Sequence, residues 1–354
     1  MEQHWERRHP FVALEEQTIS SMLHPVFPGK QLASFELLTA GKCNTNYTFT
    51  FAGSNERFVL RIYVRDKQAC QKDSDLFQLI HKRVPVPELL YTHISDQHAN
   101  NPDPRDITSI TYSIMKWVDG ELFSDVLLRQ DSSAIPACAY DIGRVLATLG
   151  SYTFPQSGFF GPGLTIAEPL PTNGRDMILS FLEECLFQQH ADQQLGPILT
   201  ARLWQFANDH AAYLDVLDNV ASLVHSDYKG MNILVHNDHN SWQVAAVLDW
   251  EFAFAGSPFF DIGNMLRFDH VHPANYSSEF IRSYREHGGQ LPAHWKKTAR
   301  LVDLTALCEF MTNPQSRGAM SHEITGLIVR TLEQWNNLDQ DWHHGPSKRK
   351  LSER

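Results

Sequence analysis

The decisive stretch of this sequence is Leu223–Val235, LVHSDYKGMNILV, which continues after a turn into Ala246–Glu251, AVLDWE. A short polar loop precedes the apolar run Ile233–Val235, and a second apolar run ends at Asp249. Short apolar runs bounded by turn residues are typical of strands. The stretch therefore predicts a loop, a strand, a hairpin turn, and a second strand that ends in a carboxylate.

Three side chains in this stretch, Asp227, Asn232 and Asp249, have the types and spacing that phosphoryl transfer needs. The transition state of that reaction resembles metaphosphate, so a protein supplies a carboxylate to orient the acceptor hydroxyl and ligands for Mg²⁺. We expect Asp227 to supply the first and Asn232 with Asp249 the second, because oxygen ligands suit magnesium. The alternative is a helix-to-strand corner in which Asp and Asn only cap turns.

These motifs closely resemble the aminoglycoside phosphotransferase family, relatives of choline and homoserine kinases and more distantly of protein kinases. The resemblance rests on the pattern His-x-Asp-x-x-x-x-Asn at His225–Asn232 and on the segment Val247–Glu251. It implies an α+β, bilobal protein-kinase-like fold, with a five-stranded antiparallel sheet plus a helix before a mostly helical lobe. It also implies that the γ-phosphate of ATP or GTP is transferred, with Mg²⁺, to a hydroxyl of a small molecule.

The same resemblance implies roles for individual residues. Asp227 would be the catalytic base, and His225 would brace its loop. Lys229 resembles the lysine that protein kinases place near the γ-phosphate, although many members of this family lack it. Asp261, in the segment Ser257–Asn264, matches a family aspartate that anchors the catalytic loop.

The first third of the chain reads as strands interrupted by one helix, because β-branched and aromatic residues gather in short runs between turn residues. The predicted strands are 35–38, 47–51, 58–64, 88–94 and 107–117, and the predicted helix is 67–81. We expect a nucleotide-binding lobe over residues 1–117, a catalytic and substrate-binding lobe over 118–342, and a disordered tail over 343–354.

The segment Gly41–Asn46 lies between two predicted strands, where kinases fold a loop over the phosphates. Such loops offer backbone N–H groups to anionic oxygens. The phosphotransferase family commonly has one glycine followed by a small polar run, so Gly41, Asn44, Thr45 and Asn46 are expected to bind the nucleotide. The alternative for the glycine is an ordinary hairpin turn.

A cation is expected where kinases pair the α- and β-phosphates with a lysine of the third strand, and here that position holds Arg61. Arginine has a permanent charge and a fork that suits phosphate. The alternative is an arginine on the exposed face of an edge strand. The following helix offers Asp73 or Asp75 as its acidic partner, and we favour Asp73.

The segment Ile114–Gly120 is the predicted hinge, because the character of the chain changes after it. By resemblance, Met115 lies beside the adenine ring, and the backbones of Lys116 and Val118 hydrogen-bond it. The alternative is an ordinary strand exit with a glycine turn.

Beyond the hinge the apolar spacing is helical, with a loop expected over 152–174. The predicted helices are 137–149, 176–188, 200–217, 277–287, 299–311 and 322–335. Several carboxylates on these helices could form an acidic pocket for the acceptor, or lie on solvated helix faces. They are Glu183, Glu184, Asp192, Asp303 and Glu309. The motifs do not distinguish antibiotics, choline, homoserine and sugars as acceptors.

The composition of the chain restricts the kinds of partner that we expect it to bind. The net charge of −11 argues against nucleic acid, which needs a basic face. No apolar segment resembles a signal peptide or a membrane span, so we expect a cytoplasmic protein, either monomer or homodimer. Five cysteines without close spacing predict reduced thiols.

The competing function is a nucleotide-binding pseudokinase that regulates without turnover. A protein kinase is disfavoured, because the sequence lacks Asp-Phe-Gly and Ala-Pro-Glu segments.

Overall fold

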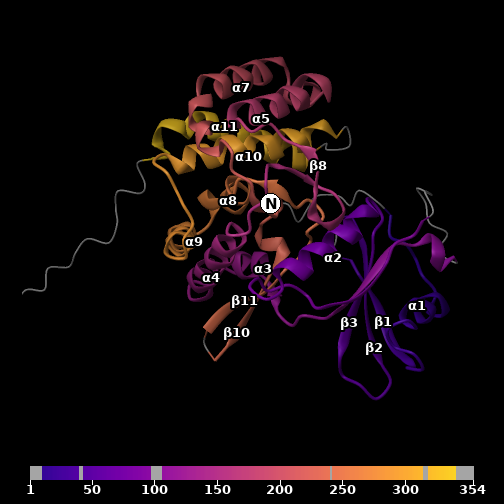
Figure 1. Cartoon of the computed structure of the whole chain (residues 1–354). Coiled ribbons are helices and arrows are strands. Elements are labelled where there is room, and N and C mark those ends of the chain that lie inside the picture. The colour runs from indigo at the N-terminus through magenta and orange to yellow at the C-terminus, as the bar shows by residue number, and fades with distance from the viewer. Residues whose placement is uncertain (1–9, 40–42, 97–105, 240, 314–317, 340–354) are drawn as a thin grey trace, which may run out of the picture. The chain divides into compact units, whose positions relative to one another are not determined.

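The computed structural model describes residues 10–39, 43–96, 106–239, 241–313 and 318–339. Within these ranges the chain forms two compact units (Figure 1). The first unit comprises residues 10–170 and 221–289, and the second comprises residues 171–220 and 290–339.

The first unit contains strands from both ends of its sequence, together with helices that cover them. Its strands are β1 (Leu32–Leu38), β2 (Thr45–Phe51), β3 (Arg57–Ile62), β4 (Leu89–His93), β5 (Tyr112–Lys116), β6 (Glu121–Leu122), β7 (Gly158–Phe160), β8 (Ile166–Pro169), β9 (Ser222–Val224), β10 (Ile233–Asp238), β11 (Ser241–Val247) and β12 (Phe254–Gly256). Its helices are α1 (Glu16–Leu23), α2 (Gln68–Ile80), α3 (Phe123–Leu128), α4 (Ala134–Leu149), α8 (Phe259–Leu266) and α9 (Ala274–Glu286).

The predicted five-stranded antiparallel sheet is confirmed, with the strand order β1-β2-β3-β5-β4. Side chains alternate in burial along β2, so Tyr47, Phe49 and Phe51 lie on the core face. Helix α1 packs Ile19 and other apolar residues into that core, and Figure 1 shows it beside the sheet. Strand β3 is therefore a central strand, and its odd-numbered positions face away from this core.

The decisive stretch folds as predicted into a hairpin. Strands β10 and β11 pair antiparallel, with Ile233 opposite Val247, and the short β6 pairs with β10 on the other side. A second small sheet has the order β8-β7-β12-β9. Strand β9 ends at Val224, so its pairing with β12 fixes the start of the polar loop that follows.

The second unit is helical. Its helices are α5 (Gly174–Glu183), α6 (Asp192–Leu195), α7 (Pro197–Asp209), α10 (Trp295–Thr312) and α11 (Ala319–Gln334). Helix α10 buries residues on most of its faces, as expected for the central helix of a bundle, and it contacts α5 and α11. Within the unit, the Trp335 ring lies edge-on to Phe206 and Tyr213.

Four predicted elements were wrong in detail. Residues 107–109 form a 3-10 turn, because the Asp106 carboxylate accepts the Thr108 N–H at 3.0 Å and ends the expected strand early. The expected loop 152–174 contains β7, which pairs with the distant β12, and β8, which pairs with β7. The expected helices 176–188 and 200–217 end in a π turn and a 3-10 segment, respectively.

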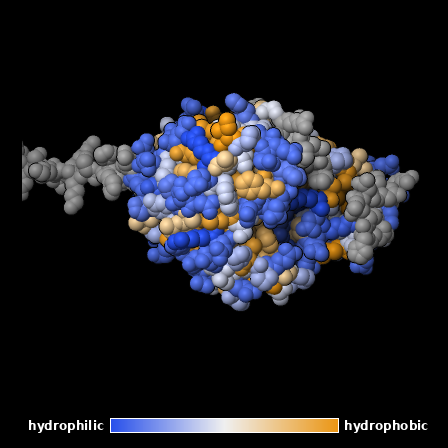
Figure 2. All heavy atoms as spheres, turned by 90° about the horizontal axis from the view of Figure 1, so that it is seen from above, coloured by the Kyte–Doolittle hydropathy of each residue, from blue (hydrophilic) through white to orange (hydrophobic). Residues whose placement is uncertain are grey.

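In the described ranges, helices of sufficient length and apolar character to cross a bilayer are not found. On the face seen in Figure 2, hydrophilic residues predominate, and hydrophobic residues form small groups between them.

Candidate active site

Asp227, Lys229 and Asn232 lie in mutual contact in the loop between β9 and β10. The Asn232 amide nitrogen donates to the Asp227 carboxylate at 2.7 Å and to its backbone carbonyl at 2.9 Å. The Lys229 ammonium lies 2.9 Å from the other carboxylate oxygen of Asp227. Because both of these contacts of Asn232 use its nitrogen, its amide oxygen is the atom it can present to a cation.

Between Asp227 and Lys229, the side chain of Tyr228 points into the protein. It is fully buried, and its hydroxyl donates to the Ile142 carbonyl of α4 at 2.9 Å. This anchor turns the two charged neighbours away from the core, where both remain about one-fifth exposed at 18% and 20%.

His225 connects the two halves of the decisive stretch. Its Nδ1 accepts the Asp227 backbone N–H at 3.2 Å, so the ring proton lies on Nε2, which donates to the Leu248 carbonyl at 2.9 Å. Burial lowers the pKa of this imidazole, which favours the neutral ring that both bonds require. The ring also packs against Trp250, with centroids 4.6 Å apart.

Asp261, on α8, holds the backbone of the loop. Its two carboxylate oxygens accept the N–H groups of His225 and Ser226, at 2.9 and 2.8 Å. Burial raises the pKa of Asp261 to about 7, although both hydrogen bonds act in the opposite direction. Asn264, one turn later, donates to the Ser226 carbonyl at 2.7 Å.

Two non-glycine residues of the site adopt left-handed backbone conformations, Ser226 with φ of 68° and Asp249 with φ of 66°. Such conformations are uncommon in side-chain-bearing residues, and they persist where surrounding contacts impose them. The bonds from Asp261 and Asn264 impose the first. The Leu248 N–H donates to the Asn232 carbonyl at 2.8 Å, which brings Asp249 to the same loop.

The carboxylate of Asp249 receives a 2.5 Å hydrogen bond from the Arg61 guanidinium of β3. Burial alone would raise the pKa of Asp249, but the charge and hydrogen bond of Arg61 hold it below its ordinary value. Arg61 is only 9% exposed and lies on the central strand, opposite Ser113 and Asn46. The alternative of an exposed arginine on an edge strand does not describe it.

Glu251 is a residue of this site to which the sequence motif gave no role. Its carboxylate lies 4.0 Å from Arg61 and accepts a 2.8 Å hydrogen bond from Asn44. Its backbone carbonyl accepts a 2.5 Å bond from Lys72 of α2. Burial raises the pKa of Glu251, and the neighbouring charge of Asp249 acts in the same direction. The only signal in the sequence was its place two residues after Asp249.

The two acids of α2 face different partners. Asp73 is 3% exposed and accepts a 2.8 Å hydrogen bond from the Tyr63 hydroxyl. Burial raises its pKa to about 6, while the charge of Arg61 acts to lower it. Asp75 instead accepts the Gly163 N–H at 2.8 Å. Among the described residues, the ion pairs of Arg61 are with Asp249 and Glu251, so its expected pairing with Asp73 is not formed.

The predicted phosphate loop is described only in part. Gly41 lies outside the described residues. The amide oxygen of Asn44 accepts the Val64 N–H at 3.2 Å, so both ends of this side chain have protein partners. The Thr45 hydroxyl accepts the Val12 N–H at 3.0 Å, and Asn46 lies opposite Arg61 in the sheet. Their contacts with a nucleotide stay predictions.

The predicted hinge, Ile114–Gly120, begins within β5, which ends at Lys116. The Lys116 N–H donates to the Glu88 carbonyl at 2.9 Å, so only the carbonyl of Lys116 can meet a ligand. Met115 is 8% exposed and pairs with Val59 and Leu89 of the flanking strands. The backbone N–H of Val118 lies just beyond the strand, and its contact with a base stays a prediction.

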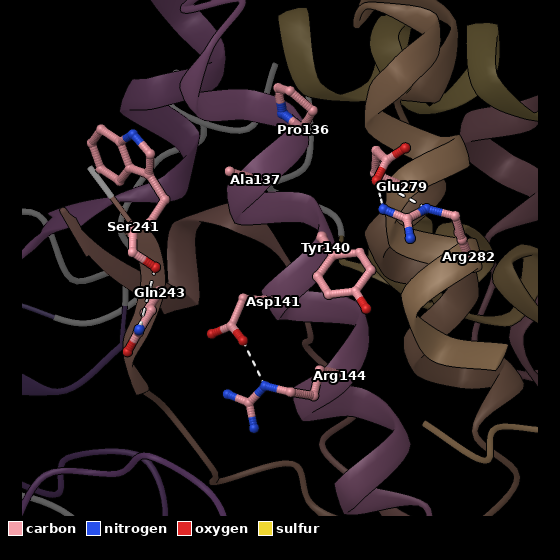
Figure 3. Close-up of a pocket in the computed structure, with 10 residues that line it drawn as sticks. Pro136, Ala137, Tyr140, Asp141, Arg144, Ser241, Gln243, Glu279 and Arg282 are labelled. Carbon is pink, nitrogen blue, oxygen red and sulfur yellow. Dashed lines mark hydrogen bonds and ion pairs between the residues drawn. The ribbon is translucent and has the colours of Figure 1, made fainter. Parts of the chain in front are cut away.

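A surface pocket of about 660 Å³ lies apart from these residues, between α4, β11 and α9 (Figure 3). Its charged side chains neutralise one another, since Arg144 pairs with Asp141 at 2.6 Å and Arg282 pairs with Glu279. No residue of the candidate active site lines it. The carboxylates proposed for an acceptor pocket, Glu183, Glu184, Asp192, Asp303 and Glu309, belong to the second unit.

Comparison with known proteins identifies the family and the fold. A sequence model of APH, the phosphotransferase enzyme family, matches residues 34–299. A thermostable mutant of aminoglycoside phosphotransferase APH(4)-Ia, in ternary complex with AMP-PNP and hygromycin B, aligns with a TM-score of 0.66 and 18% identity over 90% of this chain and 99% of that chain. The GDP and kanamycin complex of APH(2″)-IIIa aligns with a TM-score of 0.61 and 17% identity over 91% and 99%. Among curated proteins none matches. The predicted protein-kinase-like fold is confirmed.

Proposed function

The chain belongs to the phosphotransferase enzyme family, and we propose that it transfers the γ-phosphate of ATP or GTP to a hydroxyl of a small molecule, with Asp227 as catalytic base. The observation that carries this proposal is the contact of Asn232 with Asp227 at 2.7 Å. It ties the proposed base to a proposed Mg²⁺ ligand within one loop. The spacing of the motif had predicted that the side chains of Asp227 and Asn232 would lie close together.

In this proposal Asp227 accepts the proton of the acceptor hydroxyl as the new oxygen–phosphorus bond forms. The bond from the γ-phosphorus to the bridging β-phosphate oxygen breaks, and ADP or GDP leaves. Lys229 lies 2.9 Å from the Asp227 carboxylate, close enough to reach a phosphate oxygen at the reacting centre. His225 keeps Asp227 and the strand before Asp249 in register through its two ring nitrogens. General base catalysis of this kind typically contributes ~10²- to 10⁴-fold to the rate.

The donor atoms proposed for Mg²⁺ fit that ion. They are the amide oxygen of Asn232 and the carboxylate of Asp249, both hard oxygen ligands of the kind magnesium prefers. The pKa of Asp249 lies below its ordinary value, so this carboxylate is charged at neutral pH. When bound, Mg²⁺ would neutralise the charge of the nucleotide phosphates.

The nucleotide and the acceptor are proposed from chemistry and from the relatives. The two aligned structures contain AMP-PNP in one case and GDP in the other, so both ATP and GTP are candidates. The same two structures contain hygromycin B and kanamycin, so an aminoglycoside is a candidate acceptor. The net charge of −11 would favour a cationic acceptor of that kind.

A nucleotide-turnover assay tests the proposal. ATP and GTP are each supplied with Mg²⁺, and aminoglycosides, choline, homoserine and sugars are each offered as acceptor. We expect one acceptor class to stimulate turnover, and Asp227→Asn to lower kcat by ~10²- to 10⁴-fold. Asp238→Asn is the matched control, because Asp238 is exposed at the end of β10, where it contacts His239.

Two outcomes would count against the proposal. Full turnover in Asp227→Asn would show that another group is the base. Binding of Mg²⁺-nucleotide without turnover on any acceptor would favour the regulatory pseudokinase. Two features of the described residues also agree with a pseudokinase. Arg61 stands in place of the kinase lysine, and it forms no ion pair with an acid of α2.

A further inference from the structure

The pocket between α4, β11 and α9 has the size of a small-molecule site. Its volume of about 660 Å³ lies within the range of ~300–1,000 Å³ that such sites usually have. Two aromatic rings and two guanidinium groups line it, those of Tyr140, Trp242, Arg144 and Arg282. Asp141 and Arg144 project from α4 toward β11 (Figure 3). The proposed phosphoryl transfer gives none of these side chains a role.

On the α9 side of the pocket, the polar groups are already paired. Arg282 donates to Glu279 through Nε and Nη2, and to Glu286 through Nη1. Its guanidinium lies over the Tyr140 ring, 4.4 Å from the centroid, and the Tyr140 hydroxyl donates to Glu286 at 2.7 Å. All three nitrogens of Arg282 are thus engaged by protein carboxylates. This side of the pocket therefore offers a ligand a flat surface and little further charge.

On the β11 side, Arg144 has donors to spare. Its Nε donates to Asp141 Oδ1 at 2.6 Å, and Asp141 Oδ2 accepts the Val244 N–H at 2.8 Å, so both oxygens of this carboxylate are occupied. Among the described residues, none accepts a hydrogen bond from Nη1 or Nη2 of Arg144. An arginine held at Nε presents its two terminal nitrogens as a fork, and that fork fits a carboxylate.

Charge and shape together define the ligand class. The pocket also contains the carboxylates of Asp141 and Glu279, and Glu286 lies next to it. A ligand with two negative charges would be repelled by these groups, whereas a single carboxylate needs only the fork of Arg144. The half-buried ring of Trp242 gives a flat apolar body a surface to stack on. The matching ligand is a small planar aromatic molecule with one carboxylate.

Two neighbouring residues of α4 connect the pocket to the proposed catalytic loop. Asp141 holds Val244 of β11, the edge strand that leads to Asp249. The register between β10 and β11 shifts next to Val244, and strands bend at such irregularities. The Ile142 carbonyl accepts the hydroxyl of Tyr228, which is adjacent to the proposed base. A ligand that draws on Arg144 therefore acts on a helix that supports both parts of the site.

We propose that this pocket is a second ligand site, which binds a small planar aromatic monocarboxylate through the fork of Arg144 and the ring of Trp242. Its occupant acts on the catalytic loop through α4. The binding itself goes beyond the proposed function, whereas the effect on the catalytic loop rests on it. Coupling between two binding sites is reciprocal, so Mg²⁺-nucleotide must change the affinity of the pocket for its ligand by the same factor.

The first test observes Trp242. Its indole N–H resonance is assigned in ¹⁵N-labelled protein by its loss in Trp242→Phe, and benzoate, naphthoate and indole carboxylate are titrated separately. We expect a saturable shift with the acid that fits, and little shift with its uncharged amide. Arg144→Lys keeps a positive charge beside Asp141 but lacks the fork, and should weaken binding by about tenfold or more. Arg202→Gln, at an exposed position of α7, should not change it.

The comparison of acid with amide requires only the wild type, so it decides the question even if Arg144→Lys does not fold. A Trp242 signal that none of the acids shifts at millimolar concentration would overturn the site. Equal affinities for the acids and their amides, or undiminished binding by folded Arg144→Lys, would overturn it as well.

The second test measures the dissociation constant of the same acid with and without Mg²⁺ and a non-hydrolysable ATP or GTP analogue. We expect a change of about fivefold or more, which is the lower end of typical coupling between sites. Equal constants in the presence of bound analogue would overturn the effect on the catalytic loop. Failure of the proposed function is a different result, because Asp227-dependent turnover can be absent while the acid still shifts the Trp242 signal.

Discussion

The carboxylate of Asp261 accepts the backbone N–H of His225 at 2.9 Å, although 36 residues separate the two. Its second oxygen accepts the N–H of Ser226, which holds that residue in its left-handed conformation. The side chain of a buried helix thus fixes the backbone immediately before the proposed catalytic base.

Asp261→Asn should destabilise the protein and loosen the loop. An asparagine can accept only one of the two N–H groups, and its own NH₂ would face the other donor. Leaving one buried donor unpaired typically costs ~1–3 kcal/mol of unfolding free energy. Urea unfolding of both proteins measures this difference. The matched control is Asp125→Asn, since Asp125 is exposed on α3, and it should change stability by less than ~0.5 kcal/mol.

The contribution of Asp261 to stability should also depend on pH in a defined direction. Burial raises its pKa to about 7 in the folded protein, from an ordinary value of 3.8. As the pH rises between these values, the unfolded chain releases the proton and the folded protein retains it. The stabilisation is therefore complete below the lower value and is lost as the pH approaches the upper one.

Unfolding free energies measured from about pH 4 to about pH 7 check this sign, because the difference between wild type and Asp261→Asn isolates one group. That difference should shrink as the pH rises, by up to ~1.4 kcal/mol per pH unit. A difference that is constant or grows with pH would show that Asp261 is ionised throughout this range in the folded protein.

Features of this site that depend on residues close together in the sequence could be predicted, whereas contacts between residues far apart in the sequence could not. The loop and hairpin from His225 to Asp249 were predictable, because their spacing and turn residues are local. The five strands of the first sheet were also predictable from their β-branched and aromatic runs. Strands β7 and β8 were not, because they are short and β7 joins its sheet by pairing with the distant β12.

The partners of Arg61 could not be predicted from the sequence for the same reason. The alternation of β3 could place this arginine on a face, but its bond to Asp249 joins residues 188 positions apart. The role of Glu251 depends on burial and on Asn44, which lies 207 residues away. Short helices such as α3 and α8 were missed because a few apolar residues do not show a helical period.

Gly143→Ala should destabilise the first unit, although alanine favours helix by ~1 kcal/mol over glycine. Gly143 lies in α4 where it packs on α9, and an added Cβ would come within 2.2 Å of the Phe280 carbonyl oxygen. Relieving this overlap requires the two helices to separate, and overpacking typically costs ~1–3 kcal/mol or more.

Gly150→Ala is the control for this prediction. Gly150 ends the same helix with ordinary helical φ and ψ, and an added Cβ would approach nothing closer than 3.6 Å. Thermal unfolding should show a clear fall in midpoint for the first variant and little change for the second. Equal midpoints for the two variants would show that α4 and α9 adjust without strain.

Lys229→Met should lower kcat and leave nucleotide affinity nearly unchanged. The Lys229 ammonium lies 2.9 Å from the Asp227 carboxylate, at the proposed reacting centre, where its charge would act mainly on the transition state. Removal of one such electrostatic contact typically costs ~10²- to 10³-fold in kcat. Steady-state kinetics with Mg²⁺-nucleotide, and titration of a non-hydrolysable analogue, separate the two effects. Lys82→Met, at an exposed position after α2, should alter neither quantity. A raised KM for nucleotide with unchanged kcat would instead make Lys229 a binding residue of the ground state.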